Sequence, residues 1–329
     1  MSEDAPTIAQ LQAGNEDADS GLGDIESSPT SDDDSVMSEA KDYIEENGRL
    51  YHADWTAGRY LLPNDEREQE RLEIQHIILL YTDGLHRAPL PEGPQRVLDV
   101  GTGTGDWAIA FAETYTSAVV TAVDISPNVM PTETHPNCSF LVDDAENGIG
   151  LGNNEFDYIH IRLLHGLRDS RRFIALAFEA LVPGGYIEIK EFEFPLQFHD
   201  PDKAKGSALM IWSTNVVEGA LRLGIDLTIV DKIFGLLEDG GFEDIGESIC
   251  VWPIGTWPKK RRRRMLGTSL QENWFETLAA FAWRPFCVMD WHKEETQCLL
   301  ANARAEICGN KIRASMHVRT FWARKPYLD

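Results

Sequence analysis

Paired cysteines and long apolar segments are both missing from this sequence of 329 residues. The five cysteines are odd in number, scattered and never spaced C-x-x-C, which excludes a disulfide framework and a paired-cysteine zinc site. No run of about 18 apolar residues occurs, and the first ten residues lack the basic and apolar segments of a signal peptide. We therefore expect a protein of a reducing compartment, cytoplasmic or nuclear, that is neither secreted nor membrane-spanning.

Lysine and arginine are absent from residues 1–40, a stretch that holds eleven Asp and Glu. Its few large apolar side chains bury too little surface to offset the entropy lost on ordering. This predicts a disordered acidic tail over residues 1–41 and a folded domain over residues 42–329. The formal net charge of the whole chain is −24, and because that charge repels phosphates, direct nucleic-acid binding is not favoured.

Short apolar runs alternate with helical stretches between residues 96 and 192, which is typical of β-α-β units in an α/β protein. The predicted strands are Val97–Val100, Ala118–Val123, Ser139–Val142, Phe156–Ile161 and Tyr186–Ile189, and the helices between them are Asp106–Tyr115 and Arg171–Leu181. An earlier helix is predicted from Asn64 to Tyr81, with Asn64 or Asp65 as its N-cap.

After residue 193 the pattern becomes mainly helical. The predicted helices are Ala208–Leu223, Ile229–Leu237, Leu270–Ala282 and Glu294–Ile307, and the predicted strands are Ile245–Val251 and an edge-like His317–Ala323. We expect helical insertions over about 200–240 and 255–310 to cover a site on the α/β core.

An apolar strand at Val97–Val100 runs into glycines at 101, 103 and 105 and then into a helix. Glycines let the backbone approach a ligand closely, and the helix directs its N–H groups toward it, which favours a nucleotide-like cofactor. The alternative is a tight turn without a ligand. Gly103 to Ala108 also fits the relaxed G-x-G-x-x-A pattern of nicotinamide-dependent oxidoreductases, so the loop does not name the cofactor.

Asp124 ends the second predicted strand of this core, about 20 residues after the loop, where an acidic side chain reaches ribose hydroxyls. The alternative is that Asp124 only caps the next helix. Two later segments narrow the choice of cofactor, Asp143–Glu146 after the third strand and Leu181–Glu188, with its L-x-P-G-G motif, around the fifth.

In that order and spacing, these four segments resemble the class I methyltransferases. The resemblance implies a Rossmann-like, mostly parallel seven-stranded sheet that binds S-adenosylmethionine and no metal. The implied cofactor site places Asp99, Gly101, Gly103 and Gly105 around the methionine part, with Thr102 in the same loop, Asp124 at the ribose, and Asp144 with Ala145 at the adenine. Asp143 is an alternative to Asp144.

Four further segments, Arg59–Glu73, Gly101–Ile109, Phe156–Arg162 and Pro253–Pro258, resemble fungal LaeA-like methyltransferases, and the likeness runs from about Gly48 to Pro326. This branch implies a role in secondary metabolism. The leading interpretation is methylation of a small organic acceptor. The alternative is a nuclear regulator that acts through protein partners of the velvet type with little turnover.

His165 follows the fourth strand of the core, where ligands of doubly wound sheets gather, and is the candidate general base for an acceptor that must lose a proton. A packing role is the favoured alternative for it, and His160 is interpreted as a packed or partly exposed strand residue. The run Lys259–Arg264 is interpreted as a nuclear-import or acidic-partner site, as a segment that folds back on the acidic tail, or as a solvated loop. Aromatic residues of the late helices are expected in the core, with several available to cover an apolar acceptor. These are Trp274, Phe275, Phe281, Trp283, Phe286 and Trp291.

Overall fold

The computed structural model describes residues 43–52, 61–90, 93–126, 131, 135–147 and 152–327. The predicted tail, residues 1–41, lies outside the described residues, so the prediction for it stays open.

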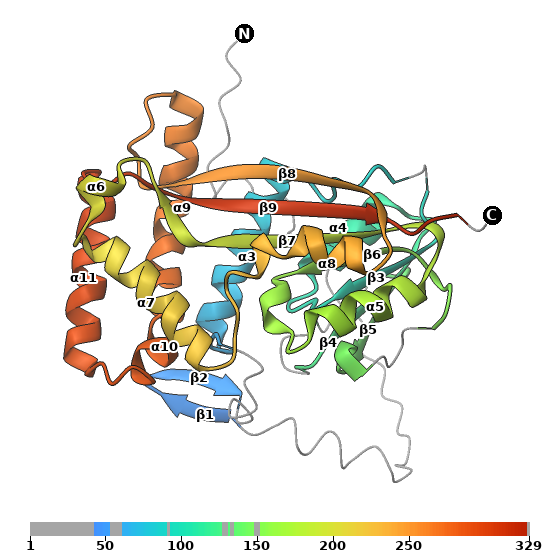
Figure 1. The fold of residues 1–329 in the computed structure, drawn as a ribbon, viewed down its shortest axis with the longest axis horizontal. Coiled ribbons are helices and arrows are strands. Elements are labelled where there is room, and N and C mark those ends of the chain that lie inside the picture. The colour runs from blue at the N-terminus through green and yellow to red at the C-terminus, as the bar shows by residue number, and fades with distance from the viewer. Residues whose placement is uncertain are drawn as a thin grey trace, which may run out of the picture.

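A seven-stranded sheet of order β5-β4-β3-β6-β7-β9-β8 forms the centre of the molecule (Figure 1). Its strands are β3 (Arg96–Val100), β4 (Val119–Asp124), β5 (Cys138–Val142), β6 (Phe156–Arg162), β7 (Leu181–Phe198), β8 (Glu243–Ile254) and β9 (Ala314–Arg324). The strands β3 to β7 pair in parallel, whereas β9 pairs antiparallel with both β7 and β8. The predicted mostly parallel, Rossmann-like sheet is confirmed.

The last strand is an interior strand, which corrects the expectation of an edge at His317–Ala323. β9 lies between β7 and β8, and the exposed edge is β8, where Ile249 is 53% exposed. A polar residue of this strand has its partner inside the protein: Thr320 is fully buried and donates to Asp83 Oδ2 at 2.8 Å. That partner is distant in sequence, so alternation alone does not reveal it.

Helices cover both faces of the parallel part of the sheet. They are α4 (Asp106–Thr114) on one face, and α5 (Ser170–Ala180) with η4 (Ile229–Asp231) and α8 (Ile233–Asp239) on the other. The part of the predicted 200–240 insertion that forms η4 and α8 therefore packs against the sheet and α5.

The remaining helices gather at one end of the long strands β7, β8 and β9 (Figure 1). They are α3 (Glu66–Asp83), α6 (Pro201–Ala204), α7 (Ala208–Arg222), α9 (Arg261–Ala280), α10 (Trp283–Cys287) and α11 (Lys293–Gly309). Apolar residues of α3, α7, α9, α10 and α11 share one core with the far halves of these strands. α9 begins about nine residues earlier than predicted, because the basic run continues directly into its apolar face.

The helix α3 begins as predicted, with Asp65 as its N-cap accepting from the Glu68 backbone N–H at 3.0 Å. Arg49 Nε donates to Asp65 Oδ2 at 2.6 Å and so ties the hairpin of β1 (Tyr43–Glu46) and β2 (Arg49–His52) to α3. This contact holds the start of α3 against the hairpin.

Candidate functional site

The glycine loop between β3 and α4 is held against the end of β4. The backbone N–H groups of Gly101 and Thr102 donate to the Val123 carbonyl at 2.8 and 3.0 Å. Gly101 and Gly103 have φ of +68° and +57°, and no atom lies within 4 Å of where a Cβ on either would be. These two glycines therefore turn an open face of backbone toward the space above the loop.

Gly105 has a different role from the other two glycines. Its φ is +80°, and a Cβ there would lie 2.6 Å from Phe140 Cε1. It is also absent from the lining of the cavity described next. The loop thus needs Gly105 for close packing beneath the site. Because Gly105 does not line the cavity, the structure does not support the prediction that Gly105 surrounds the cofactor.

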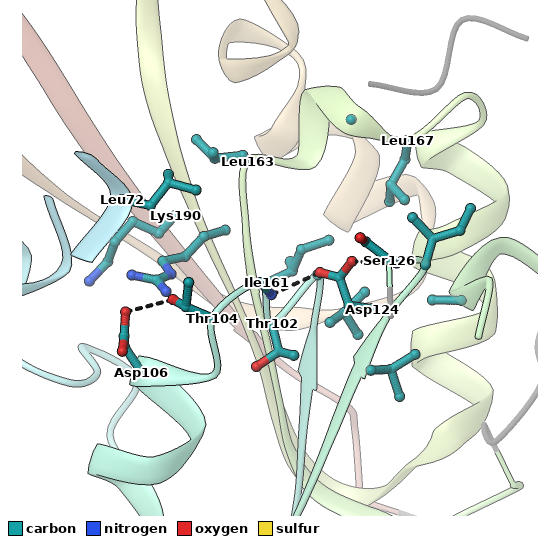
Figure 2. Close-up of a pocket in the computed structure, with 18 of the residues that line it drawn as sticks. Leu72, Thr102, Thr104, Asp106, Asp124, Ser126, Ile161, Leu163, Leu167 and Lys190 are labelled. Atoms are coloured by element: carbon teal, nitrogen blue, oxygen red, sulfur yellow. Dashed lines mark hydrogen bonds between the residues drawn. The ribbon is translucent and has the colours of Figure 1, made fainter. Parts of the chain in front are cut away.

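A cavity of about 210 Å³ opens above the loop at the carboxyl ends of β3, β4 and β6, and we call it the glycine-loop cavity (Figure 2). Figure 2 shows Thr104 hydrogen-bonded to Asp106 on one side of Thr102, and Asp124 beside Ser126 on the other. The helix α3 supplies the facing wall with Glu68, Leu72, Gln75 and Leu79. The position matches the rule that doubly wound sheets bind ligands at the carboxyl ends of their strands.

Asp124 is fixed at the end of β4 by two backbone bonds. Its Oδ2 accepts from the Gly103 N–H at 2.8 Å and its Oδ1 from the Ser126 N–H at 2.9 Å. Burial raises the pKa of the Asp124 carboxyl above its ordinary value, while these two N–H groups act in the opposite direction. A carboxylate has about four acceptor positions, so Asp124 retains capacity for the hydroxyls of a ribose.

Asp143, Asp144 and Ala145 all line the same cavity beyond Asp124. The Asp144 carboxylate accepts from the Glu146 backbone N–H at 3.1 Å and from Asn147 Nδ2 at 3.3 Å, and it therefore stabilises the turn η2 (Ala145–Asn147). Asp143 Oδ1 accepts from the Asp144 N–H at 2.7 Å. Both carboxylates remain at the cavity wall, so the choice between them at the adenine stays a prediction.

Asp99 and Thr102 are buried next to the loop, at 2% and 3% exposure. Asp99 Oδ1 accepts from His160 Nδ1 at 2.7 Å, and the His160 ring stacks on Trp107 at 3.7 Å between centroids. Asp99 Oδ2 and Thr102 Oγ1 have no hydrogen-bond partner among the described residues. Thr102 lines the cavity, whereas Asp99 is not one of its lining residues, so its charge would act on a ligand only from a distance.

His165, in η3 (Leu164–Gly166), is placed beside the site and does not line the glycine-loop cavity. Its Nδ1 lies 2.9 Å from Glu191 Oε1, and its backbone N–H donates to Glu191 Oε2 at 3.1 Å. This geometry favours the packing role, and a general base at His165 remains an untested prediction. His160 is fully buried in β6, as the sequence suggests.

Several residues of the site were not predicted, and most of them belong to α3. Glu68, Arg71 and Gln75 are buried, and Arg71 donates to Glu68 Oε1 at 2.6 Å and to Gln75 Oε1 at 2.7 Å. Their spacing of three and four residues places these polar groups on one face of the helix with buried apolar residues. Polar residues on an otherwise buried helical face are the signal that was available in the sequence.

A second, smaller cavity of about 20 Å³ adjoins the first, and we call it the aromatic cavity. The two share Gln75, Leu163 and Phe192 in their linings. The other lining residues of the aromatic cavity are Arg71, Phe194, Trp252, Asn273, Trp274, Thr277, Phe281 and Met316. Trp274 and Phe281, which the sequence offered as cover for an acceptor, therefore lie there, whereas Phe286 is buried in the core.

The basic run Lys259–Arg264 leads into the first turn of α9, and all six side chains are exposed. The expectation of a loop is therefore wrong from Arg261 onward. Lys259, Lys260 and Arg263 border a surface hollow with Trp257.

Among the described residues, no cluster of His, Cys, Asp and Glu has the arrangement to hold a metal ion. None of the helices in the described ranges is long and apolar enough to cross a membrane.

The site fits S-adenosylmethionine on observations from the structure itself. The open backbone of Gly101 and Gly103 and the positioned Asp124 carboxylate line one cavity, and the unpartnered Thr102 hydroxyl is buried in its wall. These groups match the flat, polar and hydroxylated parts of an adenosyl ligand.

Comparison with known proteins agrees with this geometry. Residues 74–218 match a family model described as a methyltransferase domain. The methyltransferase pytC of Aspergillus terreus is 31% identical over 94% of this chain and 95% of its own length. The secondary metabolism regulator LAE1 of Cochliobolus heterostrophus is 31% identical over 88% of this chain and 97% of its own.

In fold, the chain is similar to the structure of a predicted methyltransferase from an antibiotic biosynthesis pathway of Anabaena variabilis. The TM-score is 0.50, with 16% identity over 77% of this chain and 96% of that one. From the sequence relatives we conclude that this chain belongs to the LaeA-like branch of the class I S-adenosylmethionine-dependent methyltransferases.

Proposed function

We propose that this methyltransferase transfers a methyl group to a small, largely apolar organic acceptor that binds in the aromatic cavity. The observation that carries the proposal is that the two cavities are neighbours, with Gln75, Leu163 and Phe192 in the walls of both. Aromatic and aliphatic walls with a few polar groups are typical of small-molecule sites. At about 20 Å³ the aromatic cavity has room for roughly one water molecule, so an acceptor has to displace its side chains.

In this proposal the cofactor lies along the glycine-loop cavity. Gly101, Thr102 and Gly103 support its methionine part, and Asp124 binds the ribose hydroxyls. Ala145 packs at the adenine, with either Asp143 or Asp144 at its polar edge. This orientation directs the methyl group toward the boundary with the aromatic cavity.

S-adenosylmethionine supplies a methyl group on a sulfonium, which an acceptor nucleophile displaces in line while the C–S electron pair remains on sulfur. The protein contributes alignment and exclusion of water. The helix α3 covers the glycine loop, and Leu72, Leu79 and Phe192 present apolar surface to the reacting region. An acceptor with a free lone pair needs no protein base, which agrees with the placement of His165 behind the wall.

A labelling experiment tests the acceptor class. The protein is incubated with methyl-labelled S-adenosylmethionine and a fungal extract, and small molecules and proteins are then separated. We expect label in the small-molecule fraction with the parent protein and none with Gly103→Val. Label confined to the protein fraction would contradict a small acceptor.

A second function, regulation through a protein partner, is favoured by the exposed basic run at the start of α9 and by the likeness to LAE1. In this proposal Lys259–Arg264 contacts an acidic partner or acts in nuclear import. Four arginines at the positive end of a helix dipole destabilise the helix, so the negative charges of an acidic partner would offset this effect.

A further inference from the structure

Two charges of opposite sign lie next to the glycine loop and do not pair with each other, and of the two Asp99 is buried whereas Arg162 is half-buried. Arg162 ends β6 and lines the glycine-loop cavity, and Asp99 is the fourth residue of β3. Each is bonded to a histidine. Arg162 Nη1 donates to His76 Nδ1 at 3.3 Å, and Asp99 Oδ1 accepts from His160 Nδ1 at 2.7 Å. Within the described ranges, Arg162 has no carboxylate at ion-pair distance.

Neither histidine compensates these charges at neutral pH. Burial, with the nearby positive charge of Arg162 adding to it, lowers the pKa of His76 to about 3. Burial also lowers the pKa of His160 to about 4, although its bond to Asp99 acts in the opposite direction. Both rings are therefore neutral, one accepting from the arginine and the other donating to the aspartate.

A neighbouring cation in the same cavity wall, Lys190, is paired with a carboxylate of the protein. Lys190 on β7 is the register partner of Arg162, and it also lines the glycine-loop cavity. Its Nζ lies 2.8 Å from Asp83 Oδ2, so its charge is neutralised inside the protein. Buried charges are normally paired in this way, and an unpaired one is costly. Arg162 is half-buried and has no such ion pair within the described ranges; Asp99 and Asp106 act on its charge only from a distance, so the guanidinium is available to an anionic group of a ligand.

We infer that Arg162 binds the α-carboxylate of the methionine moiety of the cofactor, and that the nearby negative charge of Asp99 favours its α-ammonium group. The pairing of β3 with β6 sets Val100 opposite Ile161, so Arg162 lies level with Gly101, where the backbone is open. The planar guanidinium fork matches a carboxylate with two parallel bonds. This inference rests on the proposed placement of the cofactor on the glycine loop.

Calorimetry with two ligands isolates the carboxylate. S-adenosylmethionine and its decarboxylated form share the adenosyl group, the sulfonium and the amine, and differ only in the carboxylate. We expect the parent protein to prefer S-adenosylmethionine, and Arg162→Met to weaken its binding about 10- to 100-fold while changing the affinity for the decarboxylated ligand less than about threefold. Arg162→Lys keeps the charge without the fork, and it should retain part of the preference.

Lys190→Met is the matched control, because it removes the paired cation from the same wall. It leaves Asp83 without its lysine, so it should lower the melting temperature and keep the preference for the carboxylate. A parent protein that binds both ligands equally overturns the inference, as does full preference in Arg162→Met or loss of preference only in Lys190→Met. If Gly103→Val binds S-adenosylmethionine normally, the placement of the cofactor fails instead, and the two failures are thereby distinguished.

Discussion

The two adjoining cavities are built from different parts of the chain and by different chemistry. The glycine-loop cavity takes much of its polar wall from three short segments that follow strand ends, residues 100–104, 123–126 and 143–146. The aromatic cavity takes its wall from α3, β7, β8, α9 and β9, which meet only in the folded protein. Binding of a nucleoside constrains which residues can form the wall of the glycine-loop cavity. Ring packing in the aromatic cavity tolerates substitutions, so we expect differences in acceptor specificity among relatives to come from the aromatic cavity.

The largest expected effect is the loss of cofactor binding when Gly103, on the open side of the loop, is replaced. Gly103→Val places a branched side chain in the glycine-loop cavity at a φ of +57°, so we expect calorimetry to detect no S-adenosylmethionine binding. Circular dichroism should show an intact fold, with a melting temperature lower by about 2–4 °C.

Gly105→Val is the matched control, because its side chain meets Phe140 beneath the loop. We expect it to reduce stability more than Gly103→Val does. If Gly103→Val unfolds the protein and Gly105→Val leaves it stable, the assignment of the open side of the loop is wrong.

The next effect concerns the ribose end of the same cavity. Asp124→Ala removes an acceptor of charge-assisted bonds worth roughly 1.5–3 kcal/mol, which predicts about a 10- to 150-fold loss of affinity for S-adenosylmethionine in calorimetry. Asp124→Asn retains one acceptor oxygen and should fall between Asp124→Ala and the parent. Parent-like affinity in a folded Asp124→Ala protein would move the cofactor elsewhere.

A smaller effect tests the aromatic cavity alone. The buried Trp274 Nε1–H has no partner among the described residues, so Trp274→Phe breaks no hydrogen bond there, while it removes this donor together with part of the indole ring. We expect cofactor affinity within about twofold of the parent and methyl transfer to the small-molecule fraction about 2- to 10-fold slower.

Trp252→Phe provides the comparison for that variant. It lines the same cavity, but its Nε1 donates to Thr82 Oγ1 at 3.2 Å, so its loss should reduce stability more than transfer. Equal transfer by Trp274→Phe and the parent would remove the hydrogen-bonding role from Trp274.

The smallest effect on either cavity is expected from the basic run. Changing Arg261 through Arg264 to Gln alters exposed side chains and removes positive charge from the start of α9, so the melting temperature should not fall and cofactor affinity should stay at the parent value. The nuclear fraction in cells, or the binding of an acidic partner, should fall. If neither the nuclear fraction nor partner binding changes, these arginines are only solvent-exposed residues in the first turn of α9.

The sequence predicted the glycine-loop cavity better than the aromatic one for a physical reason. A strand, a glycine turn and a helix are local, so Val97–Val100 and Asp106–Tyr115 were placed to within one or two residues. Asp124 followed from the end of a strand. The cap at Asp65 likewise depends only on its neighbours.

Features that depend on distant partners were missed. The interior position of β9 depends on pairing with both β7 and β8, and the buried Thr320 depends on Asp83. The sequence did not single out Arg162. Nothing in its neighbouring residues shows that its guanidinium has no carboxylate partner in the folded protein. The aromatic cavity arises where Phe192, Trp252 and Trp274 converge from three elements, so no short motif encodes it.

A crystal structure of the full chain with S-adenosylhomocysteine tests the division between the cavities most directly. We predict the ribose on Asp124, the amino-acid part beside Gly101, and the sulfur facing the boundary formed by Gln75, Leu163 and Phe192. A sulfur that faces Asp143–Glu146, away from the aromatic cavity, would contradict the account.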